Sequence, residues 1–322
     1  DYFYGYLDQR HAHNYYPAVL WRNEVKEELP NQVDRRPADG DETVGGVSSN
    51  KAVYSHDLFA QEALDFVRRE KGNPFFLYLA YTIPHANNEA GMKGMEVPSI
   101  VPYENEDWPD AQKAKAAMIT RMDGDVGRLI DLLRELGLAE DTLVVFTSDN
   151  GPHKEGGADP AYFDSNGPLR GIKRDMYEGG IRVPFIAWWP GTITAGSESQ
   201  HLSAFWDFLP TACEAAGAKA PGGVDGISYL PSLLGKDQPE HEDLYWEFYE
   251  EGGKQALRKG PWKAIRLNCH KDPAGPLELY NLAEDPAEER DLANQHPDIV
   301  EQMRGRIDRA HVPTETYKFG KG

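Results

Sequence analysis

The chain has 322 residues, of which 40% are hydrophobic and 27% charged, a composition that indicates a globular protein and not a disordered one. Its formal net charge of −19 argues against nucleic acid or an anionic membrane surface as a partner. No apolar stretch approaches the ~20 residues that a membrane span requires. Only two cysteines occur, Cys213 and Cys269, so one bridge at most can form and a disulfide scaffold is excluded.

The first half of the chain has a mixture of helical and alternating apolar patterns. The first fifty residues are aromatic and turn-rich, and the stretch from Asp39 to Asn50 is predicted to be a loop. Residues Pro84 to Pro109 lack any period, and a loop of that length in a compact domain is usually functional. The predicted elements are a helix at His56–Glu70 with Ser55 as its N-cap, a strand at Phe75–Tyr81, a helix at Asp110–Leu136, and strands at Thr142–Thr147 and Arg182–Trp189. This order predicts an α/β domain with a largely parallel sheet.

The second half changes character near Gly235–Asp243, a polar stretch that contains Pro239. Before it, Ser203–Gly217 is predicted to be a short helix. Beyond it, short strands follow one another through turns, and a helix ends the pattern: Leu244–Tyr249, Gln255–Arg258, Trp262–Leu267, Leu277–Asn281 and the helix Pro297–Ala310. We therefore expect a large domain at residues 1–236 and a small α+β domain at residues 237–322.

A polar cluster follows the predicted strand Thr142–Thr147. The chain leaves this strand as Ser-Asp-Asn-Gly-Pro, and ligands in α/β sheets bind at the carboxyl ends of strands. The oxygens of Asp149 and Asn150 suit a hard cation such as Ca²⁺ or Mg²⁺, but Ca²⁺ takes ~6–8 oxygens, so further ligands must come from elsewhere. The same sequence is also good turn chemistry, and the residues alone leave both interpretations open.

Histidines and cations provide further candidates. His85 has the side chain of a general acid, although a histidine in a surface loop is the plainer interpretation. Arg170 and Lys173 lie in a glycine-containing loop that either is a solvated basic loop or binds an oxyanion through close backbone approach. His153 and His13 either line a pocket or belong to exposed loops.

Taken together, several segments resemble the sulfatase family of the alkaline-phosphatase-like superfamily. They are residues 73–85 (Asn-Pro-Phe-Phe-Leu-Tyr-Leu-Ala-Tyr-Thr-Ile-Pro-His), 142–153 (Thr-Leu-Val-Val-Phe-Thr-Ser-Asp-Asn-Gly-Pro-His), 167–173 (Gly-Pro-Leu-Arg-Gly-Ile-Lys), 177–184 (Tyr-Glu-Gly-Gly-Ile-Arg-Val-Pro) and 278–289 (Glu-Leu-Tyr-Asn-Leu-Ala-Glu-Asp-Pro-Ala-Glu-Glu). The resemblance runs from Asp1 to about Ala310. It implies an α/β fold with a mixed, largely parallel sheet flanked by helices, and a small C-terminal subdomain with an antiparallel sheet and a helix.

The resemblance also implies roles for individual residues. Asp149 and Asn150 match calcium ligands, with Mg²⁺ as the less favoured cation. His85 matches the histidine that contacts the sulfate ester and protonates the leaving oxygen, and Lys173 matches the lysine that holds the sulfate. These four residues are predicted to converge in one cleft. Three more residues are assigned to substrate binding, namely His153, Arg170 and His13.

The nucleophile of the family does not occur in this sequence. It is a formylglycine made from a cysteine or serine in a Cys/Ser-x-Pro-x-Arg motif, whereas Cys213 is followed by Glu-Ala-Ala and Cys269 by His-Lys-Asp. An early aspartate pair that binds calcium and a lysine–histidine segment are also absent. We therefore expect residues 1–236 to be the C-terminal part of a catalytic domain whose N-terminal third is missing, and we expect the chain alone to be inactive.

The function implied by the resemblance is hydrolysis of a sulfate ester, either of a carbohydrate or of an aryl alcohol, in the periplasm or outside the cell. Two alternatives stay open. One is a phosphate or phosphonate ester hydrolase of the same superfamily, against which the Gly-Ile-Lys setting of Lys173 favours sulfate. The other is a non-catalytic protein that binds an anion or a glycan. Aromatic side chains that suit stacking on sugar rings are Tyr15, Tyr16, Trp21, Trp108 and Trp246, although most aromatic residues belong to a core.

Overall fold

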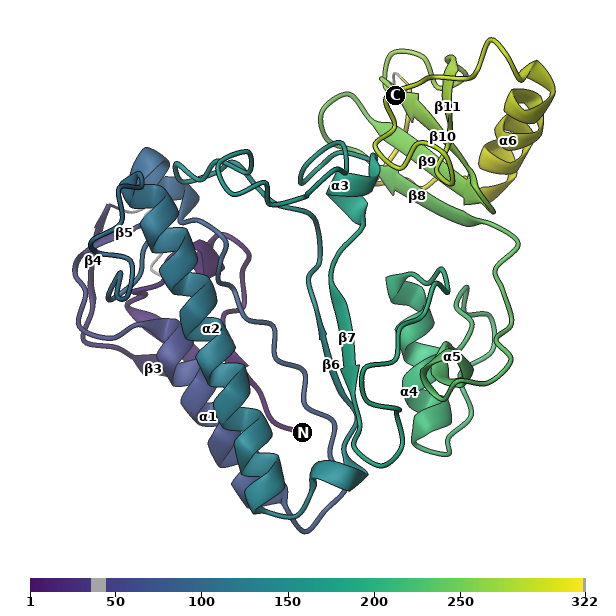
Figure 1. Ribbon diagram of the computed structural model, residues 1–322. Helices are drawn as coiled ribbons and strands as arrows, with labels where there is room; N and C mark the ends of the chain where they lie inside the picture. Colours follow the sequence, from purple (N-terminus) through teal and green to yellow (C-terminus); the bar gives the residue numbers. More distant parts are fainter. Residues whose placement is uncertain (36–44, 321–322) are drawn as a thin grey trace. The chain divides into compact units, whose positions relative to one another are not determined.

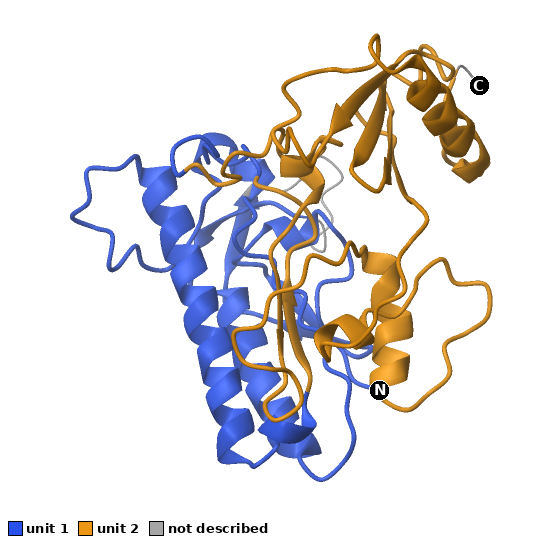
Figure 2. Cartoon of the chain, turned by 45° about the vertical axis from the view of Figure 1, so that its right-hand side comes forward, with its two compact units in different colours: residues 1–142, 153–163 blue, residues 143–152, 164–322 orange. Residues whose placement is uncertain are grey.

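The computed structural model describes residues 1–35 and 45–320 (Figure 1). The chain forms two compact units (Figure 2), and buried hydrophobic clusters lie in each of them. Unit 1 comprises residues 1–142 and 153–163, and unit 2 comprises residues 143–152 and 164–322. The chain therefore leaves unit 1, returns to it for eleven residues (153 to 163), and leaves it again.

Unit 1 combines short strands with two long helices. Its described elements are β1 (Tyr4–Gly5), β2 (Val19–Arg22), β3 (Val25–Glu28), β4 (Gln32–Arg35), β5 (Val47–Asn50), α1 (Ser55–Glu70) and α2 (Asp110–Glu135). Strands β1, β2 and β3 form one antiparallel sheet, and β4 pairs with β5 in another. Helices α1 and α2 run side by side (Figure 1), and both match the helices predicted from their apolar spacing.

Two local predictions in this part are wrong. Ser55 does not cap α1: the N-cap residue is Tyr54, and the buried Ser55 hydroxyl accepts a hydrogen bond of 2.6 Å from the hydroxyl of Tyr6. The predicted loop Asp39–Asn50 lies outside the described residues from 39 to 44, and its end forms β5. That strand is stabilised by antiparallel pairing with β4, a tertiary contact that its local sequence does not reveal.

The predicted strand Phe75–Tyr81 is also wrong. In the described part of the chain this segment belongs to no sheet, although its residues alternate between partly buried and exposed with the period of a strand. Phe76 and Tyr78 expose 69% and 80% of their surface. A strand is defined by a hydrogen-bonded neighbour, and apolar alternation cannot supply one.

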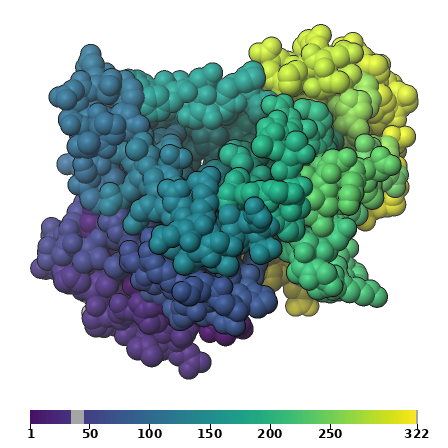
Figure 3. All heavy atoms as spheres, turned by 60° about the horizontal axis from the view of Figure 1, so that its bottom comes forward, coloured from purple at the N-terminus to yellow at the C-terminus, as the bar shows by residue number. Residues whose placement is uncertain are grey.

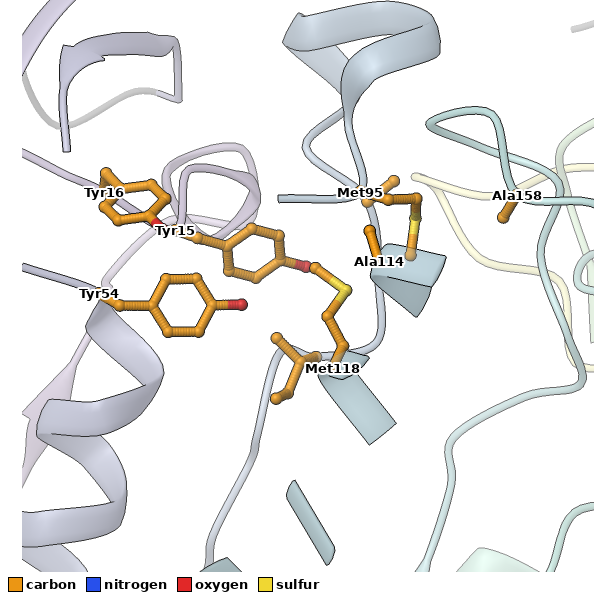
Figure 4. Packing of buried hydrophobic residues seen from close by; sticks show 9 residues of the cluster. Tyr15, Tyr16, Tyr54, Met95, Ala114, Met118 and Ala158 are labelled. Atoms are coloured by element: carbon orange, nitrogen blue, oxygen red, sulfur yellow. The ribbon is translucent and has the colours of Figure 1, made fainter. Parts of the chain in front are cut away.

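The core of unit 1 brings together segments from its whole length. Three tyrosines, Tyr15, Tyr16 and Tyr54, pack with methionines and small residues from α2 and from the 83–95 loop (Figure 4). Their partners are Ile83, Ala86, Met95, Ala114, Met118 and Ala158. Ala158 belongs to the eleven returning residues, so the core fixes that segment against the loop that contains His85.

Unit 2 begins with a two-stranded ribbon and ends with a sheet. Its described elements are β6 (Val144–Thr147), α3 (Glu178–Ile181), β7 (Phe185–Trp188), α4 (Phe208–Ala215), α5 (Leu230–Leu233), β8 (Leu244–Phe248), β9 (Lys254–Lys259), β10 (Trp262–Leu267), β11 (Leu277–Asn281) and α6 (Pro297–Ala310). The helix predicted at Ser203–Gly217 is confirmed as a 3-10 turn, Phe205–Asp207, followed by α4.

The pairing of β6 with β7 differs from the sequence-based expectation. These strands are antiparallel, as are the other strand pairs among the described residues, whereas a largely parallel sheet is predicted. A parallel connection requires a crossover, usually a helix of a dozen residues or more. The described connection between β6 and β7 contains only the four-residue α3, so the chain returns beside β6 in the opposite direction. The α/β class and the antiparallel C-terminal sheet are confirmed.

The C-terminal sheet has the order β11-β10-β9-β8 and is covered on both faces. Ala256, Ile265 and Tyr280 pack on one face with Met176 and Tyr177, at the start of α3. The neighbouring residues Leu257, Ala264 and Leu279 point to the opposite face and pack under Met303 and Ile307 of α6. In Figure 3 most atoms towards the C-terminus of the chain, coloured yellow, lie together. The domain boundary near residue 236 stays a prediction.

Two further properties concern the thiol groups of the cysteines and the apolar character of the helices. Both cysteines are free thiols, and burial raises the pKa of Cys269 to about 11, so its thiol is protonated and unreactive at neutral pH. Within residues 1–35 and 45–320, no helix has the length and apolar character needed to cross a membrane.

Candidate functional site

Three imidazole rings stack in unit 1. The rings of His13 and His85 lie 5.3 Å apart with an interplanar angle of 7°, and the rings of His85 and His153 lie 5.3 Å apart at 27°. His85 is the middle ring and the most exposed, with 29% of its side chain accessible against 15% for His13 and 9% for His153. The structure thus brings together three predicted site residues that are far apart in the sequence. We call them the histidine stack.

Main-chain contacts hold His85 in place. Its Nδ1 lies 2.7 Å from the carbonyl oxygen of Ala86, and its own carbonyl oxygen accepts a hydrogen bond from the buried hydroxyl of Tyr15. A Cβ atom on Gly156 would lie 2.5 Å from the Cβ of Ala86, so the two segments touch through a glycine. Because Tyr15 belongs to the core of unit 1, the position of His85 is tied to the packing of that core.

His153 has both ring nitrogens engaged by the main chain. Its Nε2 lies 3.0 Å from the carbonyl oxygen of Pro84, and its Nδ1 accepts a hydrogen bond of 3.1 Å from the amide of Glu155. The first contact requires a proton on Nε2 and the second a lone pair on Nδ1, so this arrangement selects the neutral tautomer. His153 therefore contacts Pro84, the residue next to His85, and its assignment to substrate binding stays a prediction.

Two carboxylates flank the histidine stack, and the sequence analysis missed both. Glu89 lies 3.2 Å from Nδ1 of His13, and Glu155 lies 3.5 Å from Nε2 of His85 and 3.4 Å from Nδ1 of His153. In the sequence both look like ordinary polar loop residues. For Glu155 the available signal is its place two residues after His153 and immediately before Gly156-Gly157, where a close packing contact is easily made.

Asp149 and Asn150 lie at the end of β6 in unit 2, as predicted. Asp149 is exposed. The side-chain Nδ2 of Asn150 donates to the carbonyl oxygen of Gly151 at 2.9 Å, which leaves the amide oxygen as the atom suited to coordinate a cation. Two oxygens are a partial set for a hard cation. Among the residues that the structure describes, no group of three or more His, Cys, Asp or Glu side chains is arranged to hold a metal.

Glycines join the loop after β6 to the loop that contains Lys173. The amide of Lys173 donates to the carbonyl oxygen of Pro152 at 2.9 Å, and the amide of Gly151 donates to that of Gly180 at the same distance. A Cβ on Gly151 would lie 1.9 Å from the carbonyl oxygen of Gly179, so no side chain fits there. These contacts bring Asp149 and Asn150 near Lys173 in unit 2, and we call the three segments 148–152, 167–173 and 177–182 the glycine-bonded loops.

Arg170 anchors these loops to the C-terminal sheet. Its Nη1 donates to the hydroxyl of Tyr280 at 3.1 Å and to the carbonyl oxygen of Glu288 at 2.8 Å, and its guanidinium lies 3.9 Å from the ring centroid of Tyr177. The predicted role of Arg170 in substrate binding is therefore less well supported by its contacts than a role as an anchor.

A buried ion network adds to this anchor. The ammonium group of Lys263 is fully buried and lies 2.8 Å from Glu178 and 2.9 Å from Glu288. Glu288 also accepts a hydrogen bond of 2.6 Å from the amide of Glu178, the first residue of α3. Burial raises the pKa of Glu288, and Lys263 opposes this effect. The network fixes the start of α3, and with it one of the glycine-bonded loops, on the sheet.

The predicted site residues therefore form two groups. Unit 1 holds His13, His85 and His153 together, and unit 2 holds Asp149 and Asn150 with Lys173. Their convergence in a single cleft would join the two units and stays a prediction.

Comparisons with known proteins identify relatives of both parts of the chain. The Sulfatase family model matches residues 2–218, and the model described as N-sulphoglucosamine sulphohydrolase, C-terminal, matches residues 171–312. The chain is 33% identical to steryl-sulfatase of Rattus norvegicus over 291 residues, which is 79% of this chain and 48% of that protein. It is 37% identical to N-acetylgalactosamine-6-sulfatase of Rattus norvegicus over 216 residues, which is 64% of this chain and 37% of that protein.

A solved structure is similar over nearly the whole chain. The crystal structure of Ps i-CgsB in complex with k-i-k-neocarrahexaose superposes with a TM-score of 0.70 at 27% identity, covering 91% of this chain and 57% of that one. The chain spans about half, or less, of the length of the two curated relatives.

Proposed function

Because this chain belongs to the sulfatase family, which the match over residues 2–218 establishes, we propose that it supplies part of the active site of a sulfate ester hydrolase. The observation that carries the proposal is the main-chain hydrogen bond from Lys173 to Pro152. It joins the main chain of Lys173 to Pro152, which lies two residues after the Asp149–Asn150 pair in unit 2, and this supports a shared role for the lysine and the two oxygen donors. A sulfate group needs both, because its charge must be neutralised in a chain whose net charge is −19.

The proposed metal ligands are Asp149 and Asn150. An exposed carboxylate and an amide oxygen are hard donors, and Ca²⁺ accepts such oxygens in larger and more flexible sets than Mg²⁺, so we favour Ca²⁺. When bound, the cation supplies positive charge to the sulfate oxygens, and the formylglycine of the family supplies the nucleophile. The Cys/Ser-x-Pro-x-Arg motif from which that group is made does not occur in this chain.

Lys173 and His85 carry the proposed chemistry of the chain's own residues. Lys173 holds the sulfate and stabilises the negative charge that increases on its oxygens in the transition state. His85 acts on the leaving group. As the bond between sulfur and the alcohol oxygen breaks, its electron pair stays on that oxygen, and the proton on Nε2 of His85 moves to it. His85 is then neutral and takes up a proton from solvent.

The other predicted residues have supporting roles in this proposal. His153 holds Pro84 and thereby the adjacent His85, and Arg170 anchors the loop that contains Lys173. His13 forms one face of the histidine stack and is the remaining candidate for direct contact with substrate.

For the substrate we propose a sulfated carbohydrate. Ps i-CgsB was crystallised with a neocarrahexaose, and one curated relative is named for N-acetylgalactosamine 6-sulfate chemistry. We further propose, from family resemblance alone, that the protein acts in the periplasm or outside the cell. A phosphate or phosphonate ester hydrolase is the competing proposal within the superfamily.

The leaving-group dependence of His85→Ala tests the assignment. This test requires an assembled enzyme, in which the chain is combined with a sulfatase segment that carries the matured Cys/Ser-x-Pro-x-Arg motif. We expect His85→Ala to lower kcat/KM by ~10²–10⁴ on a sugar sulfate and much less on nitrophenyl sulfate, because only the sugar alcohol needs a proton as it departs. Equal losses on both substrates would show that His85 binds sulfate and donates no proton.

A second measurement tests the reaction class. Lys173→Ala should lower kcat/KM on both sulfate esters by ~10²–10³, the cost of losing one charge-stabilising group. The unaltered enzyme should prefer nitrophenyl sulfate to nitrophenyl phosphate and to a phenylphosphonate ester. A preference for either phosphorus ester would contradict the proposed sulfatase activity and support a phosphate or phosphonate ester hydrolase. Binding of the sulfate ester without any turnover would favour the non-catalytic alternative.

A further inference from the structure

Glu155 lies against two rings of the histidine stack, but its two contacts differ in kind. Nδ1 of His153 already accepts a hydrogen bond from the Glu155 amide, so it has no proton to offer the Glu155 carboxylate 3.4 Å away. Nε2 of His85 lies 3.5 Å from the same carboxylate. Of the two rings, that of His85 is therefore the one that can present a proton to Glu155.

His85 has an acceptor at each ring nitrogen. Nδ1 faces the carbonyl oxygen of Ala86 at 2.7 Å, and Nε2 faces the carboxylate of Glu155. A neutral imidazole has one N–H and one lone pair, so one of these two contacts would place a lone pair against an oxygen. Only the doubly protonated imidazolium presents an N–H to both.

The separation of 3.5 Å also matters. It is an ion-pair distance and is too long for a strong hydrogen bond, so the Nε2 proton is stabilised by the charge of Glu155 without being held by it. A proton in that position can be directed to another acceptor at shorter range. Glu155 itself has only 17% of its side chain exposed, which limits screening of its charge by solvent.

We propose that Glu155 is a positioning residue that keeps His85 protonated and oriented as the proton donor. This inference rests on the function proposed above. Gly156 and His153 complete the arrangement: the glycine allows the 153–157 segment to approach Ala86, and the His153 ring fixes the Pro84 carbonyl. Each turnover removes the Nε2 proton, and the negative charge of Glu155 then favours its return from solvent.

The groups that contact His85 influence the pKa that a titration of its ring would measure. The ring of His13 lies on one face and is paired with Glu89, the neutral ring of His153 lies on the other face, and Glu155 lies at the Nε2 edge. Glu155→Gln removes this charge and alters no residue at positions 13, 89 and 153. Any change in the titration of His85 then reports the effect of Glu155.

The test is a histidine titration followed by NMR on the 322-residue chain labelled with ¹⁵N at its histidines, with the His85 signals assigned by their loss in His85→Gln. We expect Glu155→Gln to lower the pKa of His85 by about one pH unit, since an opposite charge at this range shifts a pKa by ~1–3 units. Glu106→Gln is the matched control. It removes one carboxylate from an exposed site, and the pKa of His85 should stay within ~0.2 pH units of the unaltered chain.

The same pKa of His85 in the unaltered chain and in a folded Glu155→Gln chain would overturn the proposal. If Glu155→Gln does not fold, Glu155→Asp provides the test, because its side chain is one methylene shorter and moves the carboxylate away from His85. A lower pKa of His85 in Glu155→Asp supports the proposal, and an equal one contradicts it.

A second readout uses the assembled enzyme. In Glu155→Gln, the limb of the pH profile on which activity falls as pH rises should move about one pH unit lower for a sugar sulfate, and Glu155→Asp should restore part of the shift. A uniform loss of kcat at all pH values, with the limb unmoved, would show a merely structural role. An enzyme inactive on every sulfate ester, combined with the expected NMR shift, would overturn the proposed function and leave the role of Glu155 standing.

Discussion

The histidine stack in unit 1 and the glycine-bonded loops in unit 2 are held by different means. The stack consists of side chains that bond to nearby main-chain groups: three imidazoles, two carboxylates and the Tyr15 hydroxyl from the core. The loops depend on the backbone, with glycines in contact and amides bonded to carbonyls, and on buried charges that fix α3 to the C-terminal sheet. Substitutions should therefore change protonation in the first region and the path of the chain in the second.

The largest effect is expected where the loops join the buried ion network. Lys263→Met leaves Glu178 and Glu288 buried without their cation, which should cost about 3–5 kcal/mol of the free energy of unfolding. Urea unfolding followed by circular dichroism measures it. Lys259→Met, which removes a partly exposed lysine from an outer ion pair on the neighbouring strand, should cost less than about 1 kcal/mol. Equal midpoints for the two variants would contradict the importance of the network.

A smaller effect is expected for a methyl group between the loops. Gly151→Ala would place a Cβ 1.9 Å from the carbonyl oxygen of Gly179, and the loops must separate to accept it, at a cost of about 1–3 kcal/mol. Gly222→Ala is the control, because its Cβ would meet no atom of the described residues within 4 Å. Hydrogen exchange at the Lys173 amide should accelerate in the first variant only. Unchanged exchange there would mean that backbone contact does not hold the loops.

The smallest effect concerns unit 1, where a side chain supports the helix pair. Burial raises the pKa of Asp125, but hydrogen bonds from His56 and Arg128 outweigh this and hold it below its usual range. A carboxylate with a lowered pKa stabilises the fold above the unfolded pKa near 4, and the stabilisation is lost as pH falls through the folded pKa. Asp125→Asn should therefore lower the free energy of unfolding by about 1 kcal/mol at pH 7 and by less at pH 3.

Asp131→Asn on the same helix is the matched control for that comparison. Its side chain is 76% exposed and pairs with Arg134 one turn away, so its removal should have almost no effect at either pH. A difference between Asp125→Asn and the unaltered chain that does not shrink in acid would contradict the assigned role of the charge.

The sequence predicted those parts of the fold that depend on local pattern. Apolar spacing located α1 and α2, and turns between short strands located the C-terminal sheet. It did not reveal β1 to β5, because strands of two to four residues are too short to show a period and are specified by their partners. The prediction of a strand at Phe75–Tyr81 is wrong because this segment has the alternation of a strand but pairs with no neighbouring strand among the described residues.

The sequence indicated some residues of the candidate site and not others, because contacts between distant segments are not visible in local sequence. Asp149, Asn150, His85 and Lys173 lie in motifs whose order resembles a family, so their types and spacing were informative. Glu155 contacts a ring 70 residues earlier in the chain, and the glycines that follow it indicate close packing but not the partner. The resemblance assigned His153 to substrate binding, which stays a prediction, and it did not reveal the contacts of its ring nitrogens with Pro84 and Glu155.

The alternating segment 75–81 has a consequence for the chain in concentrated solution. Its sequence, Phe-Phe-Leu-Tyr-Leu-Ala-Tyr, has high β-propensity, no charge and neither proline nor glycine, and Phe76 and Tyr78 are largely exposed. Such a segment can pair with a copy of itself and stack into an intermolecular sheet. Pro74 and Pro84 lie close to its two ends, and because proline has no amide hydrogen they limit how far that pairing can extend. We therefore expect this segment of seven residues, with a proline near each end, to promote aggregation of the chain.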